Sequence, residues 1–307
     1  MASTTIQRLA QARRMCHRRA CRRVVTRIER SPRSHMPHMP HPFDAAIALA
    51  PTGEHTFSGA TQAAYANMVG PFGGTTCAVL LNAALRHPQR LGDPAALTVN
   101  YAAALADGAF TIDARAVRTN RSTQHWSLSL SQHGEVCATA SAVFALRRPT
   151  WSAAEAAPPQ HMPDAASLPR APLQGRPPWV RCYDMRFAEG GMPERFDAQE
   201  QAHSRSRLWV RDEPPRPLDF ASLAAICDVF FPRIFIRRRR FTPIGTVSLS
   251  TYFHADAALL AAQGERHVLG CARGVAFRDG YFEQSAEVWG DCGVLLASSQ
   301  QLVYFKD

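Results

Sequence analysis

One pattern occurs twice in this 307-residue chain, and it restricts the fold more than any other feature of the sequence. In each copy, a single amphipathic helix is followed by four apolar or alternating segments that are typical of strands. The copies lie about 150–160 residues apart, which is too long for a solenoid repeat and fits a duplicated domain. Two such units can join their sheets edge to edge, so we expect one longer, continuous sheet.

The first copy begins with the motif Gly-Pro-Phe-Gly-Gly at residues 70–74. A helix is predicted over residues 75–87, where apolar side chains recur at helical spacing and Pro88 ends the pattern. We read the segments that follow as an antiparallel meander of four strands, at residues 97–104, 110–117, 124–131 and 136–146.

The second copy repeats this order. A helix is predicted over residues 219–231, with Asp219 as an acidic N-cap and Pro232 as its stop. Residues 133–140 parallel residues 292–299, and residues 97–101 parallel residues 248–252. Strands are predicted at residues 244–254, 268–277, 282–289 and 294–305.

The positive charge of the chain lies almost entirely in its first 42 residues. The whole sequence has a net charge of +10, but this segment holds ten arginines and one acid, Glu29. We predict that this segment is a disordered tail. Three alternatives remain: an organellar transit peptide, an arm that binds nucleic acid, or an upstream extension read in error, with the true start at Met36 or Met39. The remaining body carries about +1, so we expect no nucleic-acid partner for it.

The body divides into three parts. Residues 43–149 are predicted as the first helix-plus-sheet unit, residues 150–178 as a Pro/Ala-rich linker, and residues 179–307 as the second unit. No stretch reaches the roughly 18 uncharged apolar residues that a membrane span needs. The best candidate, residues 221–236, is interrupted by two charged residues and a proline, Asp228, Pro232 and Arg233.

The eight cysteines include no C-x-x-C pair and no set with Cys/His spacing typical of metal sites. We interpret them as buried, reduced thiols of a cytoplasmic protein, and we expect neither a metal nor a cofactor.

Asp228 departs from the pattern of its helix. At 100° per residue it falls about 80° from Phe220, on the flank of the apolar stripe. An ionised carboxylate in that position needs hydrogen bonds to offset its desolvation. Two interpretations follow. Asp228 is a residue at the helix end whose side chain faces solvent or bonds a neighbouring backbone group, or it is a buried general base.

The order of several motifs resembles acyl-CoA thioesterase II and its relatives. The resemblance covers about residues 43–307 and implies a tandem (double) hotdog fold of the α+β class, in which two helix-wrapped antiparallel sheets are joined in one chain. The motifs are the Gly-Pro-Phe-Gly-Gly segment at 70–74, Arg-Ser-Thr at 121–123, residues 138–144, Thr246 with Tyr-Phe-His at 252–254, and Gly293 with Ala-Ser-Ser-Gln at 297–300.

The resemblance also implies a catalytic set. Matched to this sequence, the family's Asp is Asp228, its Thr is Thr246 and its Gln is Gln300. The expected activity is hydrolysis of acyl-CoA thioesters to free fatty acid and CoA by water that Asp228 activates and Thr246 and Gln300 hold. Gly73 and Gly74 are candidates for polarising the thioester carbonyl, because uncapped N–H groups at a helix N-terminus attract negative charge.

Two positions depart from the family pattern, which leaves alternatives open. Ser248-Leu249 stand where thioesterase II has an Asp-His pair, and Thr75 stands where a Gln is usual. The alternatives are a non-catalytic acyl-CoA-binding protein and a hotdog dehydratase or hydratase, which needs a His paired with an acid near a helix.

Four consecutive arginines follow the second helix, at residues 237–240. They form either a solvated loop or a clamp for the phosphates of CoA, with Arg238 and Arg239 as the candidate ligands. We also expect a homo-oligomer, because hotdog sheets often pair further.

Overall fold

The computed structural model describes residues 40–306. The first half contains helices α2 (Pro42–Ala46) and α3 (Gly73–Arg86), and the second contains α4 (Phe220–Ile226), α5 (Arg233–Arg238) and α6 (Ala257–Gln263). The strands of the first half are β1 (Ala50–Pro51), β2 (Thr56–Ala60), β3 (Asp93–Tyr101), β4 (Ala109–Thr119), β5 (Thr123–Gln132) and β6 (Glu135–Ala145). Those of the second half are β7 (Tyr183–Glu189), β8 (Ser206–Asp212), β9 (Ile244–Phe253), β10 (Val268–Arg278), β11 (Tyr281–Trp289) and β12 (Leu295–Phe305).

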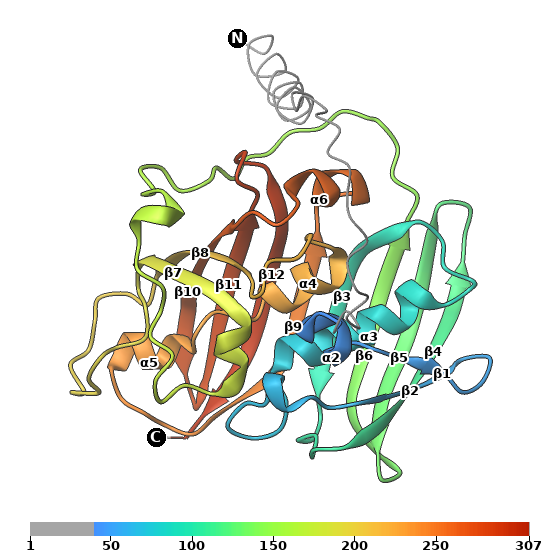
Figure 1. The fold of residues 1–307 in the computed structure, drawn as a ribbon, viewed down its shortest axis with the longest axis horizontal. Coiled ribbons are helices and arrows are strands. Elements are labelled where there is room, and N and C mark those ends of the chain that lie inside the picture. The colour runs from blue at the N-terminus through green and yellow to red at the C-terminus, as the bar shows by residue number, and fades with distance from the viewer. Residues whose placement is uncertain (1–39, 307) are drawn as a thin grey trace, which may run out of the picture. The chain divides into compact units, whose positions relative to one another are not determined.

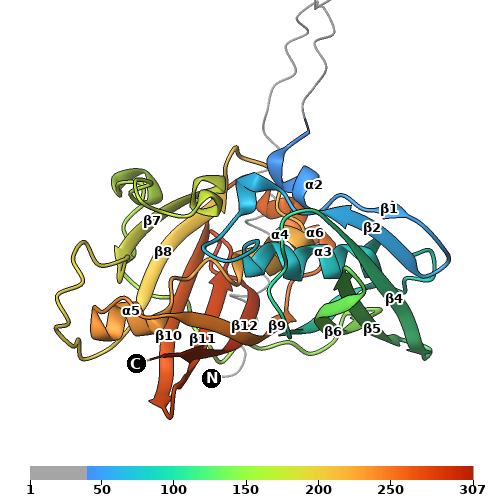
Figure 2. The same cartoon turned by 90° about the horizontal axis from the view of Figure 1, so that it is seen from below.

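The described strands form one sheet of twelve, in the order β1-β2-β4-β5-β6-β3-β9-β12-β11-β10-β8-β7, and neighbouring strands are antiparallel. Helices α3 and α4 lie next to each other on one face of this sheet (Figures 1 and 2). The helix α3 is buried along most of its length because its sequence, GGTTCAVLLNAALR, is apolar on nearly every side. Each half is thus an antiparallel sheet wrapped around a helix.

The two halves join through β3 and β9, as the duplicated pattern predicts. These strands pair with Leu97 opposite Thr251 and Thr98 opposite Ser250, and the hydroxyl groups of Thr98 and Ser250 lie 2.9 Å apart. Thr98 and Ser250 occupy matching positions in the two halves, so this pair marks the axis that relates them. The predicted parallel between residues 97–101 and 248–252 matches Thr98 with Leu249. The correspondence in the structure is therefore shifted by one residue.

The prediction of simple meanders is wrong at one strand of each half. The strand β3 pairs with β6 rather than with β4, and β9 pairs with β12 rather than with β10. In each unit the first strand lies beside the last one, so the connection from the first strand to the second passes across the two strands between them. This crossover leaves β3 and β9 free to meet.

The eight predicted strands are present, and several elements were not predicted. The missed strands are β1, β2, β7 and β8, and the missed helices are α2, α5 and α6. The predicted helix at 219–231 ends at Ile226. The predicted tail of residues 1–42 lies outside the described residues except for its last three positions.

The segment between the halves, predicted as a linker, contacts β8 at Pro163 and β7 from residue 165 onward. Arg186 donates hydrogen bonds to the carbonyls of Ala165 (3.1 Å) and Leu168 (3.2 Å). Arg186 is itself fixed by the buried carboxylate of Asp184, at 3.0 Å, which also contacts His267 at 3.0 Å. The cations beside Asp184 hold its pKa below the usual value despite burial. This network keeps the second part of the linker in a fixed place.

Candidate active site

Asp228 lies in the turn directly after α4. The helix starts where the sequence predicts, because the side chain of Asp219 accepts a hydrogen bond of 2.8 Å from the backbone N–H of Ser222. It then gives way to a tight turn in which the N–H of Asp228 donates to the carbonyl of Ala225. Since the chain no longer follows the helix, the side chain of Asp228 reaches toward the first half of the protein.

The N-terminus of α3 approaches Asp228 from the first half, and glycine makes this approach possible. A Cβ atom on Gly73 would lie 2.7 Å from Oδ2 of Asp228, and one on Gly74 would lie 2.7 Å from the carbonyl oxygen of Ala225. The backbone N–H of Gly74 donates a hydrogen bond to the Asp228 carboxyl group. The positive end of the α3 dipole therefore faces this carboxylate.

A glutamine from the centre of β12 completes the site. The Nε2 atom of Gln301 donates to Oδ1 of Asp228 at 2.7 Å and lies 3.0 Å from Oγ1 of Thr246. Asp228 and Thr246 are thus brought together as the resemblance implies, since both bind the same amide nitrogen. Thr246 lies near the start of β9, opposite Val303 of β12.

The predicted glutamine, Gln300, is one residue away from the one that the structure places here. Side chains alternate between the two faces of a strand, so a shift of one residue reverses the direction of the side chain. Gln301 is buried and faces the helices, whereas Gln300 is exposed on the opposite face of β12. The assignment of Gln300 to the site is therefore wrong, and Gln301 takes its place.

A further glutamine, which the sequence analysis missed, fixes the orientation of Gln301. Gln284 lies opposite Gln301 in the pairing of β11 with β12 and is 2 % exposed. Its Nε2 atom donates to Oε1 of Gln301 at 3.0 Å. Because the oxygen of Gln301 is occupied by this donor, its NH₂ group is the end that faces Asp228 and Thr246.

Burial changes the acidity of Asp228. Desolvation raises the pKa of its carboxyl group from 3.8 to about 7, although the hydrogen bonds from Gln301 and Gly74 oppose this shift. The carboxyl group is therefore poised to gain and lose a proton near neutral pH. Strongly shifted pKa values of this kind gather at catalytic sites, where a base must match the pH at which it works.

Tyr101 supports the other side of the site. Its hydroxyl donates to the carbonyl of Gly73 at 2.9 Å and lies 3.1 Å from the thiol of Cys77. Burial raises the pKa of both the Tyr101 hydroxyl and the Cys77 thiol above their usual values, so both stay neutral. The hydroxyl of Tyr101 thus holds the first residue of α3 against Asp228.

The first half lacks an equivalent set of side chains. A bulge near Thr246 offsets β9 from β12, and a bulge at the same place offsets β3 from β6. This correspondence places Pro94 where the second half has Thr246, and Ala142 where it has Gln301. The helix α3 also contains no acidic residue. Of the two related positions, one is therefore equipped with a carboxylate, a hydroxyl and an amide.

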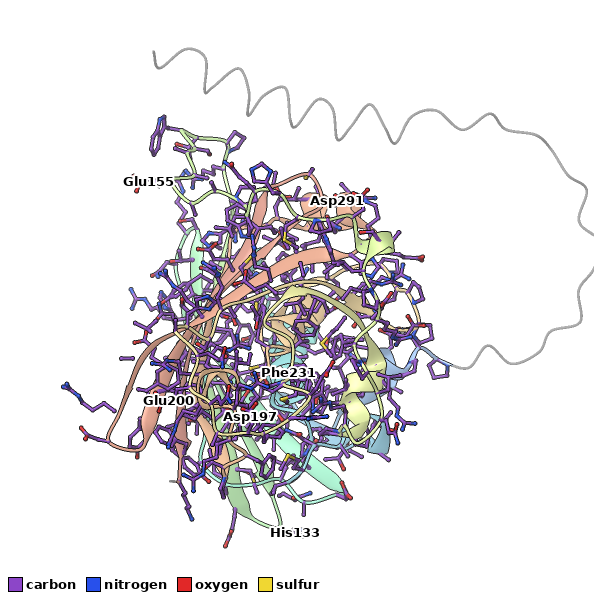
Figure 3. All side chains as sticks on the ribbon, turned by 90° about the vertical axis from the view of Figure 1, so that its left-hand side faces the viewer. His133, Glu155, Asp197, Glu200, Phe231 and Asp291 are labelled. Atoms are coloured by element: carbon purple, nitrogen blue, oxygen red, sulfur yellow. The ribbon has the colours of Figure 1, made fainter. Side chains whose placement is uncertain are left out.

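The predicted phosphate ligands are paired with acids in the structure. Arg239 lies 2.9 Å from Asp197, and Arg238 lies 3.8 Å from Glu200, which is also 3.4 Å from Arg237. Figure 3 shows this side of the protein with Asp197 and Glu200 labelled. The arginines at the end of α5 thus form ion pairs with the acidic side chains of a neighbouring loop.

Neither a metal site nor a membrane span is predicted from the sequence, and the structure describes residues 40–306. In that range no three His, Cys, Asp or Glu side chains are grouped so that they could hold a metal ion. No helix in the same range is both long and apolar enough to cross a bilayer. Of the cysteines described there, Cys77, Cys137, Cys182 and Cys227 are buried.

Comparisons with known proteins agree with this architecture. Residues 62–145 match the model of the acyl-CoA thioesterase N-terminal domain, and residues 154–305 match that of the C-terminal domain. No protein of curated function matches the chain.

Solved structures show the same fold. A conserved protein of unknown function with a hot dog fold from Alicyclobacillus acidocaldarius is 48% identical, with a TM-score of 0.82 over 88% of this chain and 99% of that one. A putative thioesterase II from Thermobifida fusca is 19% identical, with a TM-score of 0.72 over 86% and 97% of the two chains. A tesB protein from Mycobacterium avium subsp. paratuberculosis is 17% identical, with a TM-score of 0.71 over 87% and 100%.

The fold is thus the double hotdog that the sequence motifs imply, and both halves of the chain match their own domain of one family. The chain belongs to the acyl-CoA thioesterase family.

Proposed function

We propose that this protein hydrolyses acyl-CoA thioesters to free fatty acids and CoA, with Asp228 as the general base. The observation that carries the proposal is the buried carboxyl group of Asp228, whose pKa is raised to about 7 and which is bonded to Gln301 beside Thr246. A carboxylate with this pKa can take a proton from water at neutral pH and release it again.

The reaction needs one water molecule and no covalent intermediate. Asp228 accepts a proton from the water as its oxygen attacks the thioester carbonyl carbon, and the hydroxyl of Thr246 holds that water in line. The tetrahedral intermediate then breaks its C–S bond, and the proton on Asp228 passes to the departing thiolate of CoA. Gln301 keeps Asp228 and Thr246 at a fixed separation throughout, because it binds both.

The two glycines have different parts in this scheme. The N–H of Gly74 is already bonded to Asp228, so it orients the base rather than the substrate. We assign the polarisation of the thioester carbonyl to Gly73, which is the first residue of α3. Preorganised backbone donors of this type stabilise the charge that develops on the oxygen in the transition state.

The structure does not favour the alternative of a dehydratase or hydratase. That chemistry needs a histidine near the substrate, and the sequence offers His87 at the end of α3. His87 is 3 % exposed, and its Nε2 atom lies 3.2 Å from Nδ1 of His55. Its Nδ1 atom accepts a hydrogen bond from the backbone of Gln89 at 3.2 Å. Both ring nitrogens are thus engaged inside the protein.

The test of the proposed function is a panel of straight-chain acyl-CoA esters, with the released CoA thiol measured by a chromogenic thiol reagent. We expect turnover of at least one ester with kcat in the range of ordinary enzymes, about 1 to 10³ per second. Tight binding of the same esters without thiol release would instead support the non-catalytic acyl-CoA-binding alternative.

The pH dependence of hydrolysis should follow the carboxyl group of Asp228. Because the base must be ionised, kcat/KM should fall about tenfold per pH unit below pH 7 and level off above it. The measurement is kcat/KM from pH 5 to 9 in buffers of constant ionic strength. An acidic limb near the ordinary aspartate value of 3.8 would contradict a buried base.

The adjacent glutamines of β12 provide a matched pair of variants. Gln301→Ala removes the amide that aligns Asp228 with Thr246, and we expect it to lower kcat/KM by about 100-fold through lost positioning. Gln300→Ala removes an exposed amide from the other face of the strand, so its effect should stay below about threefold. Equal effects in the two variants would contradict the placement of Gln301.

The hydrogen bond from Gln301 also lowers the pKa of Asp228. The acidic limb of Gln301→Ala should therefore lie at a higher pH than that of the wild type. A limb at unchanged pH would mean that the amide acts without contacting the base.

Three further predictions from the sequence stay proposals. Binding of CoA phosphates by Arg238 and Arg239 would require those side chains to exchange Glu200 and Asp197 for phosphate oxygens. A cytoplasmic location and a homo-oligomeric state are the other two.

A further inference from the structure

A pocket beside the catalytic residues has a feature that hydrolysis alone does not explain. It is lined by residues 169–172 and Arg176 of the linker, by Phe187 of β7, by residues 191–192 and by Phe231. The pocket has a volume of about 130 Å³. Ordinary ligand pockets have roughly 300–1,000 Å³, so this one has room for the end of an acyl chain rather than for a whole ligand. Phe231 is labelled in Figure 3, on the side where the loop that holds Asp197 and Glu200 lies.

The pocket is close to Asp228. Phe231 follows Asp228 by three residues, so their Cα atoms are no more than about 11 Å apart. Trp179 stacks on Phe72, with ring centroids 4.2 Å apart, and also contacts Phe231 at 6.3 Å. Phe72 directly precedes the first residue of α3. A continuous aromatic wall therefore leads from the N-terminus of α3 to the pocket.

The two cations in the lining differ in their surroundings. Arg170 lies 3.9 Å from both Asp184 and Glu213 and donates to the carbonyl of Tyr183 at 3.2 Å. Its charge is thus balanced inside the protein.

Arg176 is different. Its guanidinium carbon lies 6.0 Å from the centroid of Phe231, and its Nε atom is buried without a hydrogen-bond partner. Desolvation lowers the pKa of Arg176, yet a guanidinium group stays charged in proteins. A cation with an unused buried donor therefore borders a pocket of mainly proline, alanine, phenylalanine and methionine side chains. An unfilled donor of this kind favours an anionic ligand group.

We propose that this pocket receives the far end of the acyl chain and that Arg176 binds a carboxylate group there. The inference rests on the proposed function and names its substrate class: thioesters of dicarboxylic acids, in which one carboxyl group is joined to CoA and the other is free. The apolar lining suits the methylene chain, and the planar fork of Arg176 suits a terminal carboxylate. The phosphates of CoA fit less well, since several charges would have to enter a mainly apolar pocket.

A second pocket differs from this one in both volume and charge. It lies along α3, is lined by Thr76, Val79 and Leu130 among others, and contains no cationic side chain in its lining. Its volume is about 20 Å³, compared with about 130 Å³ for the pocket beside Phe231. The larger volume and the presence of Arg176 thus distinguish the pocket beside Phe231.

The experiment compares octanoyl-CoA with suberoyl-CoA, which have the same number of acyl carbons and differ in the terminal carboxylate. In the wild type we expect kcat/KM for suberoyl-CoA to exceed that for octanoyl-CoA at least tenfold. In Arg176→Met this ratio should fall at least tenfold, whereas Arg195→Met, which changes an exposed arginine, should preserve it. A wild-type ratio of one or less, or an unchanged ratio in Arg176→Met, would overturn the proposal.

Two further measurements separate the possible failures. Free CoA as an inhibitor tests the phosphate source: an equal loss of CoA affinity and of suberoyl-CoA turnover in Arg176→Met would assign the anion to CoA and overturn the proposal. If no ester is hydrolysed at all, the proposed function fails. Calorimetry with free suberate then still tests whether the pocket binds a carboxylate through Arg176. Binding to the wild type but not to Arg176→Met would support the pocket, and no binding would refute it.

The position of the acyl chain can be tested with a substitution that leaves the charge of the pocket unchanged. Ala171→Leu narrows the pocket, so it should lower the ratio of kcat/KM for octanoyl-CoA to that for acetyl-CoA at least fivefold. An unchanged ratio would place the acyl chain elsewhere and would contradict the proposal.

Discussion

Asp228→Asn is expected to lower kcat for acyl-CoA hydrolysis by about 10²- to 10⁴-fold, which is the usual contribution of a general base. Asn has nearly the same shape as Asp but cannot take a proton from water. The residual rate should lose the acidic limb near pH 7, because the group responsible for it is gone. The measurement is thiol release from the best acyl-CoA ester across the pH range.

A matched control is available in Asp107→Asn, which changes an exposed aspartate of the first half. It should leave kcat within about twofold of the wild type. Full activity of Asp228→Asn would remove Asp228 from the mechanism, and with it the proposed reaction.

The same substitution should reveal the burial of the carboxyl group in the stability of the protein. The pKa of Asp228 is raised in the folded state, so between about pH 4 and pH 7 the folded protein binds more protons than the unfolded chain. Its stability therefore falls as the pH rises through this window. Because Asn does not titrate, Asp228→Asn should gain up to about 4 kcal/mol relative to the wild type between pH 4 and pH 8. Urea unfolding at both pH values measures this difference.

Arg233→Met is expected to lower the free energy of unfolding by about 3–5 kcal/mol. Arg233 is completely buried at the start of α5, where burial lowers its pKa to about 9. Its guanidinium group donates to the carbonyls of Phe231 (2.9 Å) and Ser204 (2.8 Å) and to the hydroxyl of Ser206 (2.7 Å). Methionine fills a similar volume but leaves these buried acceptors without their donor.

Arg195→Met serves as the control for this prediction, since surface substitutions usually change stability by less than about 0.5 kcal/mol. The midpoint of urea unfolding at pH 7 measures both variants. An unchanged midpoint for Arg233→Met would mean that water or another donor satisfies those carbonyls.

Periodicity predicted the repeated units well because long apolar patterns define helices and sheet faces without knowledge of the fold. The strands β5 and β12 agree with the sequence within one residue at each end. The strand β7 was missed although Tyr183, Met185 and Phe187 alternate with polar residues. Its alternation includes Asp184, whose burial depends partly on cations from distant parts of the chain, Arg211 and His267, and could not be read locally.

The helix end and the site glutamine show a different limit. The sequence contains no strong stop before Pro232, so the turn that exposes Asp228 to α3 depends on tertiary contacts. In β12 both faces carry apolar side chains, since Leu302 and Tyr304 are exposed while Val303 is buried. The pattern therefore does not decide which of two adjacent glutamines faces the helices.

The two charged residues that interrupt the apolar segment at 221–236 proved more informative than the segment itself. Asp228 is the candidate base, and Arg233 is a buried cation in the adjoining helix. Each charge within this apolar run thus marks a buried ionisable group with a shifted pKa.

The approach of Gly73 and Gly74 to Asp228 makes the candidate site depend on both halves of the chain. The second half holds the acid, and the first half supplies the amide that binds it. Under the proposed function, neither half would then be active alone. Fragments cut between the halves would be inert singly and should regain turnover only when they reassemble.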